Sequence, residues 1–537
     1  MLNLRIITRT ICLFLSALVF VAAGCSRSEN YSLTEVRKLI DNGHFDKASK
    51  ALDSLLKRNP DDKQALLLRA REQERVDDLE LALDDYNQLL EKYPDFLDAA
   101  ESRGKLKIRL KDYDGALDDL QKVFQKGKKD ERLLSSLGLA YFFKKDFDKA
   151  RELFNQSEKI DQKYEGPYFG RAAIDIDEKN YPSAIQELDS LLRFHPDNAQ
   201  ALFRRGFAYL KDSDPKKALD DFNKALELDP DLKEIYWYRA ETNRALNRPE
   251  DALKDYEKAE QSDPNDPILY LNQGTILMGM GRYSEALEDL TRSIVLDPEN
   301  PLPFINRAVL QFDTGNLLAS LSDLNKAIKL RGDDPQLLIR RAYIFKLMAR
   351  GDRALDDLDT ALASDPGNHQ ALLLRGGLYF NETQLERAIG DLGEAINQTP
   401  DDPSPYQLLA EALLLKGDRK AALEQAQLAL QRDSSYIPAY ITIGDIQMSD
   451  LNYDQAAEAY SRALSIDGNN FEARLKRAKL YIALKDFPEA VDDLDAATKI
   501  NPYSGEVYAL RSQCYGALGN QEKAQQDTWR ARVFVNR

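Results

Sequence analysis

The chain has 537 residues, of which 43% are hydrophobic and 31% charged, a balance that excludes an intrinsically disordered protein. Lys and Arg total 74 against 90 Asp and Glu. The resulting net charge of −16 has the wrong sign for nonspecific binding to nucleic acid, although net charge alone does not exclude a local basic patch. Three His and three Cys leave little room for a metal site or a disulfide framework. We therefore expect no nucleic acid partner, no metal and no cofactor.

The first 24 residues have the layout of an export signal. Arg5 and Arg9 are the only charges before a nearly continuous apolar run over residues 11–23, which is too short to span a membrane comfortably. The small residues Ala22, Ala23 and Gly24 end this run. A basic segment, an apolar segment and a group of small residues in this order predict a secretory signal peptide over residues 1–24.

Residue 25 is a cysteine, and the segment Ala22-Ala23-Gly24-Cys25 resembles the cleavage box of a bacterial lipoprotein signal, although that family more often has Leu where Ala22 stands. The resemblance implies that Cys25 is lipidated, that residues 25–31 form a short tether, and that Ser26 directs the protein to the outer membrane. We therefore expect an exported protein anchored at the periplasmic face of the outer membrane. The alternative is ordinary cleavage, which leaves Cys25 a plain thiol on a soluble periplasmic or secreted protein.

From residue 29 to residue 537 the sequence repeats every 34 residues. Dipeptides that end in proline mark the unit, among them Asn59-Pro60, Asp229-Pro230 and Asn501-Pro502, and no insertion disturbs their spacing. Positions are numbered here so that this proline is position 32, and position 20 is then Ala in every repeat except at Ser320. The predicted repeats are 29–62, 63–96, 97–130, 131–164, 165–198, 199–232, 233–266, 267–300, 301–334, 335–368, 369–402, 403–436, 437–470, 471–504 and 505–537.

Each repeat holds two predicted helices. In repeat 6, apolar residues recur at helical spacing on both sides of residues 212–215, where Asp214 can cap the second helix and Pro215 can occupy its first position. In repeat 1, Ser32 and Glu35 have the spacing of a capping box, which predicts that the first helix begins near residue 32.

This unit resembles the tetratricopeptide repeat (TPR), a 34-residue helix–turn–helix. Repeat 6 follows the family pattern at positions 4, 8, 11, 20, 24, 27 and 32, with Leu202, Gly206, Tyr209, Ala218, Phe222, Ala225 and Pro230. The resemblance covers residues 29–537. It implies an all-α, right-handed superhelical solenoid of antiparallel helix pairs, with a long concave surface that binds protein or peptide partners.

Position 7 departs from the family pattern, which has Leu there. It is Arg in ten repeats, and position 23 of the same ten repeats is Asp or Glu. Since the two positions lie on antiparallel helices, we predict an ion pair within each of these repeats, with a row of ligand-reading arginines as the alternative. The predicted pairs include Arg205 with Asp221, Arg239 with Asp255, Arg307 with Asp323, and Arg341 with Asp357.

Positions 2, 5, 9 and 12 share one face of the first helix, and in the TPR family this face lines the concave groove. Repeats 2 and 3 place charges there, whereas repeats 4 to 10 place large apolar side chains. We predict that this apolar stripe binds an extended peptide or a partner helix; the alternative is that curvature covers it and makes it core. Its predicted members are Phe142, Phe169, Phe203, Phe207, Trp237, Leu271, Met278, Ile305, Phe312, Ile339 and Tyr343.

The sequence contains no phosphate-binding glycine loop, no His-Glu-x-x-His, no Gly-x-Ser-x-Gly and no Cys-x-x-Cys. We therefore expect a non-enzymatic scaffold that binds proteins or peptides. The resemblance to TPR lipoproteins implies a role in an envelope complex for secretion, pilus assembly, outer-membrane protein assembly or polysaccharide export. Two alternatives are a holdase-like carrier of unfolded exported chains and a regulatory subunit of a cell-wall enzyme.

Overall fold

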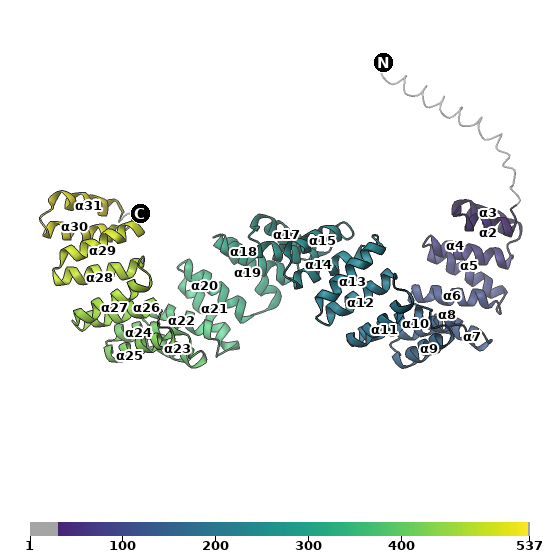
Figure 1. Ribbon diagram of the computed structural model, residues 1–537, viewed down its shortest axis with the longest axis horizontal. Coiled ribbons are helices and arrows are strands. Elements are labelled where there is room, and N and C mark those ends of the chain that lie inside the picture. Colours follow the sequence, from purple (N-terminus) through teal and green to yellow (C-terminus); the bar gives the residue numbers. More distant parts are fainter. Residues whose placement is uncertain (1–30, 535–537) are drawn as a thin grey trace, which may run out of the picture. The chain divides into compact units, whose positions relative to one another are not determined.

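The computed structural model describes residues 31–534, and all regular secondary structure in that range is α-helical (Figure 1). The prediction of an all-α protein is confirmed. The chain forms two compact units, which divide between Pro264 and Asn265. The predicted signal peptide and Cys25 lie outside the described residues. Between residues 31 and 534, no helix is both long and apolar enough to cross a membrane.

Unit 1 alternates the first and second helices of successive repeats, each packed against its neighbours in the chain. The first helices are α2 (Leu33–Asp41), α4 (Lys63–Arg75), α6 (Leu97–Arg109), α8 (Glu131–Phe143), α10 (Gly166–Asp177), α12 (Ala199–Lys211) and α14 (Glu234–Ala245). The second helices are α3 (Phe45–Arg58), α5 (Leu79–Lys92), α7 (Tyr113–Gln125), α9 (Phe147–Ile160), α11 (Tyr181–Phe194), α13 (Pro215–Leu228) and α15 (Pro249–Glu260).

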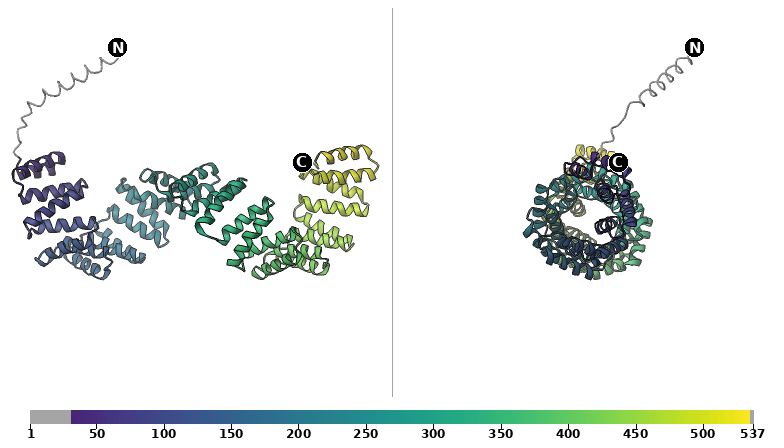
Figure 2. Two further views of the ribbon diagram at one scale, coloured as in Figure 1. Left: turned by 180° about the vertical axis from the view of Figure 1, so that it is seen from behind. Right: turned by 90° about the vertical axis from the view of Figure 1, so that its right-hand side faces the viewer.

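Unit 2 continues the alternation. Its first helices are α16 (Pro267–Gly279), α18 (Pro301–Asp313), α20 (Pro335–Leu347), α22 (His369–Asn381), α24 (Pro403–Lys416), α26 (Ile437–Ser449), α28 (Phe471–Leu484) and α30 (Gly505–Ala517). Its second helices are α17 (Tyr283–Leu296), α19 (Leu317–Arg331), α21 (Gly351–Ser364), α23 (Leu385–Gln398), α25 (Arg419–Arg432), α27 (Tyr453–Ile466), α29 (Phe487–Ile500) and α31 (Gln521–Phe534). The C-terminal helices α28 to α31, coloured yellow-green to yellow, are stacked as successive layers in Figure 2.

Side chains at the helix starts satisfy backbone N–H groups that the helix itself leaves free. The predicted capping box is confirmed: the Ser32 N–H donates to the Glu35 carboxylate at 2.7 Å, and the Glu35 N–H donates to Ser32 Oγ at 3.3 Å. Helix α13 begins at Pro215, and the Asp214 carboxylate accepts a bond from the Lys217 N–H at 3.2 Å. These caps fix where α2 and α13 begin.

The turn between the two helices of a repeat always contains a residue in the left-handed conformation at position 15. Only some repeats place Gly there, for example Gly281 and Gly417. Elsewhere the position holds an ordinary residue with φ between 54° and 65°, such as Lys145 or Leu451. Because the left-handed conformation is energetically unfavourable for L-residues with a side chain, the packed helices on either side must impose it.

Small residues at positions 8 and 20 let the two helices of a repeat approach closely. In repeat 6, a Cβ added to Gly206 would lie 2.7 Å from the ring of Phe222 and 3.3 Å from the Ala218 carbonyl oxygen. Ala218 and Phe222 are both fully buried. The core therefore lies between the two helices of each repeat and the next first helix, in successive clusters such as the one from Val36 to Ala140 and the one from Phe304 to Ala395.

In ten repeats, the arginine of position 7 joins the first helix to the second helix of the same repeat. Arg205 donates from Nε and Nη2 to the two carboxylate oxygens of Asp221 at 2.8 and 2.7 Å. The same two-bond geometry links Arg239 with Asp255, Arg307 with Asp323, and Arg341 with Asp357. Because these four aspartates are only 4–6% exposed, each guanidinium compensates a charge that would otherwise be buried alone.

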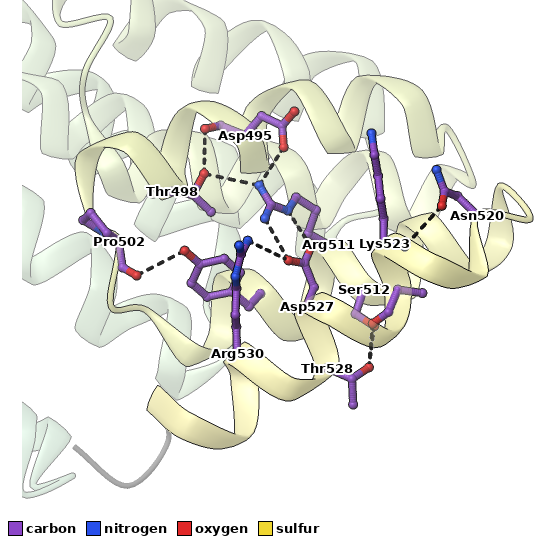
Figure 3. A network of polar contacts seen from close by, with 12 residues as sticks. Asp495, Thr498, Pro502, Arg511, Ser512, Asn520, Lys523, Asp527, Thr528 and Arg530 are labelled. Carbon is purple, nitrogen blue, oxygen red and sulfur yellow. Dashed lines mark hydrogen bonds and ion pairs between the residues drawn. The ribbon is translucent and has the colours of Figure 1, made fainter.

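Each of these arginines also reaches back to the preceding repeat. The Nη1 atom of Arg205 donates to Asp189 on α11 at 2.6 Å, and that of Arg239 donates to Asn223 on α13 at 2.8 Å. In repeat 15, Arg511 lies between Asp527 on α31 and Asp495 on α29 (Figure 3). The acceptor is always position 25 of the preceding repeat, so the arginine connects repeats as well as the helices within one.

Candidate functional site

The predicted groove face of unit 2 forms a cavity of about 820 Å³, called here the unit 2 cavity. Four successive first helices, α18, α20, α22 and α24, supply most of its walls from positions 2, 5, 6, 9 and 12. The repeat lattice brings these positions to one side because each repeat places its first helix in the same way. The apolar lining residues are Val309, Phe312, Ile339, Tyr343, Leu373, Leu374, Phe380 and Leu408, among others.

Three members of the predicted stripe line the unit 2 cavity. Ile339 is only 7% exposed and forms part of its floor, whereas Tyr343 is 44% exposed. The rings of Phe312 and Tyr343 lie 5.9 Å apart at a tilt of 58°, so they form one aromatic wall from two repeats.

The other predicted members in unit 2 do not line this cavity. Leu271 is 8% exposed and is therefore a core side chain. Met278 and Ile305 are half-buried, and Ile305 packs against the hydrophobic cluster that contains Phe304 and Ala308. The predicted stripe of unit 2 is thus divided between surface and core, and among its predicted members only Tyr343, on α20, is exposed.

In unit 1 the predicted stripe is a half-buried aromatic cluster. Phe203 lies 6.2 Å from the ring of Phe222 and 5.5 Å from that of Tyr238, and Phe207 and Trp237 also contact Tyr238 at 5.3 and 5.1 Å. Tyr238 occupies position 6, which the prediction of the stripe left out. Further along the chain toward the N-terminus, Phe142 and Phe169 are half-buried as well.

Repeat 11 contributes lining residues that the sequence reasoning missed. Leu373 and Phe380 occupy positions 5 and 12, and Gly377 occupies position 9 between them. A Cβ added to Gly377 would meet only Leu408, at 4.0 Å, so the missing side chain leaves room inside the cavity. The signal was available, because the same positional rule that selected Ile339 also selects Leu373.

Charged side chains from three of the four helices line the cavity, and Asp313 on α18 is the first of them. Arg340 and Lys346 on α20 line one part, and Glu411 on α24 lines another. Burial, followed by the negative charges of Glu472 and Asp445, raises the pKa of the Glu411 carboxyl above its ordinary value. The charge distribution is therefore acidic at α18 and α24 and basic at α20 between them.

The described residues contain no group of three or more His, Cys, Asp or Glu side chains arranged to hold a metal ion. The three histidines lie at a helix start or in turns: His44 caps α3, His195 follows α11 and His369 begins α22. His369 interacts with Asp402 at 3.0 Å and with Thr399 at 2.5 Å, which ties the start of α22 to the end of its own repeat.

Family models of the tetratricopeptide repeat match the chain in both units. The matched ranges are 33–95, 67–131, 131–164, 199–232, 271–335, 348–405 and 447–514. Two of them, 131–164 and 199–232, coincide with repeats 4 and 6 of the sequence frame.

Curated relatives match only part of the chain. DnaJ homolog subfamily C member 7 of Mus musculus is 26% identical over 138 residues, which is 24% of this chain and 28% of the relative. The homolog from Dictyostelium discoideum is 28% identical over 122 residues, which is 20% of this chain and 23% of the relative. The match therefore spans less than a third of either relative.

Solved structures of helical repeat proteins are similar over longer stretches. The APC/C hetero-tetramer Cut9-Hcn1 has 17% identity and a TM-score of 0.39, covering 94% of this chain and 98% of that one. Yeast Tom70 has 18% identity and a TM-score of 0.35, covering 83% and 99%. A tetratricopeptide repeat protein from Parabacteroides merdae has 18% identity and a TM-score of 0.34, covering 53% and 98%. TM-scores this low support no inference about ligands.

Proposed function

The chain carries tetratricopeptide repeats in both units, and we propose that it is a non-enzymatic scaffold that binds a protein or peptide partner in the unit 2 cavity. The observation that carries this proposal is the cavity of about 820 Å³ lined by apolar side chains of four successive first helices. Its volume lies within the range of about 300–1,000 Å³ that is typical of ligand pockets. Its walls include accessible aromatic surface at Tyr343, and surface of this kind favours association with a partner.

We further propose that the scaffold works in the bacterial cell envelope and supports the assembly of an envelope complex. This part rests on the sequence pattern over residues 1–25, which combines a signal peptide with a cysteine at the expected cleavage point. A lipid on Cys25 would hold the repeats close to a membrane, because only seven residues, 26–32, separate Cys25 from the first helix in the sequence.

The anchor is tested by labelling living cells with a palmitate analogue. We expect the wild-type chain and a Cys514→Ala variant to incorporate the label, and Cys25→Ala to lose it. Cys514 is a suitable control because it is fully buried in α30. Equal labelling of the Cys25→Ala and Cys514→Ala variants would refute the anchor.

The partner is tested by photocrosslinking in cells, with the crosslinking amino acid in place of Tyr343. Tyr503 is the matched control, because it is also a tyrosine of unit 2, is 66% exposed and does not line the cavity. We expect a discrete product from position 343 that position 503 does not give. Many different exported proteins at position 343 would instead indicate the holdase-like carrier. Identical products, or none, at both positions would overturn the proposed site.

A further inference from the structure

Four charged side chains line the unit 2 cavity, Asp313, Arg340, Lys346 and Glu411, and within residues 31–534 none of them forms an ion pair. Arg340 and Lys346 have no carboxylate within ion-pair distance among the described residues, although they lie on the same helix as Arg341, which is fully paired with Asp357. Arg340 is exposed and Lys346 half-buried. Two unpaired cations beside an apolar wall provide a binding position for a ligand carboxylate, which an arginine can hold with two parallel hydrogen bonds.

Glu411 gives the α24 end of the cavity the opposite character. It is half-buried, the Thr442 hydroxyl donates a weak bond to it at 3.5 Å, and the Gln407 side chain also forms a hydrogen bond with it. The positive charge of Lys476 on α28 acts on Glu411, but Lys476 is already paired with Asp445 at 2.5 Å. Among the residues described, Glu411 therefore has no ion-pair partner and faces further negative charge from Asp445 and Glu472.

We propose that the unit 2 cavity binds an apolar peptide segment that carries an acidic side chain beside Arg340 and Lys346 and a basic side chain beside Glu411. This inference rests on the proposed function and adds the chemistry of the partner. The apolar residues of the segment occupy the floor formed by Ile339, Leu373 and Phe380. The opposite charges at α20 and α24 fix the direction of the segment, because a reversed segment would bring like charges together at both helices.

A displayed library of random 12-residue peptides tests the charge preference. The full chain is used as bait in the wild-type form and as Arg340→Glu and Glu411→Lys variants. We expect wild-type selections to be enriched in apolar segments that carry both an acidic and a basic residue. Arg340→Glu should lose only the acidic preference, and Glu411→Lys only the basic one.

Matched charge reversals away from the cavity control for changes in net charge. Arg462→Glu on α27 and Glu424→Lys on α25 alter exposed residues that do not line it, and both should select the same peptides as the wild type. For one selected peptide carrying a fluorophore, we expect Arg340→Glu to weaken binding at least about tenfold, as expected for a lost charged contact. Arg340→Gln provides a second variant should the reversal disturb folding, which the helical circular dichroism reports.

The outcomes separate this inference from the proposed function. Apolar peptides that require Tyr343 but show no charge preference would overturn the inference and leave the proposed function standing. Selections unaffected by Tyr343→Ala, or no enrichment with the wild type, would overturn both. A charge preference that persists in Arg340→Glu and Glu411→Lys would place the binding elsewhere and contradict the assignment to these residues.

Discussion

The ion pair between Arg205 and Asp221 provides the sharpest test of how the repeats are held together. Replacing Arg205 with Ala removes two bonds to Asp221, at 2.8 and 2.7 Å, and one bond to Asp189 at 2.6 Å. Asp221 is 6% exposed and would be left as a buried charge without a partner. Losing one member of a buried pair costs about 3–5 kcal/mol. Because the Arg205 side chain is 22% exposed, we expect a loss near the lower end of this range.

Native-state hydrogen exchange measured by mass spectrometry reports this loss where it occurs. In an array of repeats stability is local, so the amides of α12 and α13 should lose protection more than those of distant repeats. A double change, Arg205→Met with Asp221→Leu, replaces the pair with apolar side chains and should cost far less. Asp189→Ala should cost about 0.2–1 kcal/mol, since Asp189 is 39% exposed. Equal losses from the single and double changes would refute the pairing, and a uniform loss of protection would refute its local action.

Three further predictions concern packing, charge and backbone conformation. In urea titrations, the free energy of unfolding of Gly206→Ala should be about 1–3 kcal/mol lower than that of Gly390→Ala, because the Cβ added at Gly206 meets Phe222 at 2.7 Å whereas Gly390 faces open space. Equal free energies of unfolding for the two variants would contradict tight packing at Gly206. Burial raises the pKa of Glu411, so the folded state is favoured while this carboxyl is neutral. This stability is fully present below the ordinary pKa of a glutamate and is lost as the pH rises through the raised pKa. Glu411→Gln should therefore raise the Tm at pH 7.5, with a gain that vanishes toward pH 4, and a gain independent of pH would argue against burial as the cause. Leu451→Gly should stabilise by about 0.5–1 kcal/mol, because Leu451 has a φ of 62° and is 68% exposed; a loss of stability would show that its backbone is not strained.

The helical layout could be predicted because the same local rules recur in every copy of the repeat. Proline at position 32, alanine at position 20 and the Ser32–Glu35 pattern each fix a boundary or a close contact by chemistry that is local to the chain. The left-handed turns could not be predicted in the same way. Lys145 and Leu451 have no local preference for φ near 63°, and the conformation comes from the two helices that the turn must connect.

The accessible part of the groove could be predicted only in outline. Helical spacing places Leu271 and Ile339 at position 5 and Tyr343 at position 9 of the same face. Exposure nevertheless ranges from 7% at Ile339 to 44% at Tyr343, because it depends on the side chains of the adjacent repeats. Gly377 also contributes to the cavity, because the absence of a side chain there leaves space. A search for large apolar residues does not detect such a position.

The arginines of position 7 show the limit of comparing positions within one repeat. That comparison finds the acceptor at position 23, but it cannot find the second acceptor, at position 25 of the preceding repeat, whose identity varies between Asp, Asn, Thr and Ser. With this second bond, Arg307, Arg341 and Arg375 connect repeats 8 to 11 in series. The series stops at repeat 12, where position 7 is Leu409, and the unit 2 cavity ends on the same helix, at Leu408 and Glu411. Three of the four helices that wall the cavity therefore belong to repeats that are cross-linked in this way, as repeats 13 to 15 also are. A wall held in place in this way loses less conformational freedom when a peptide binds, which favours affinity.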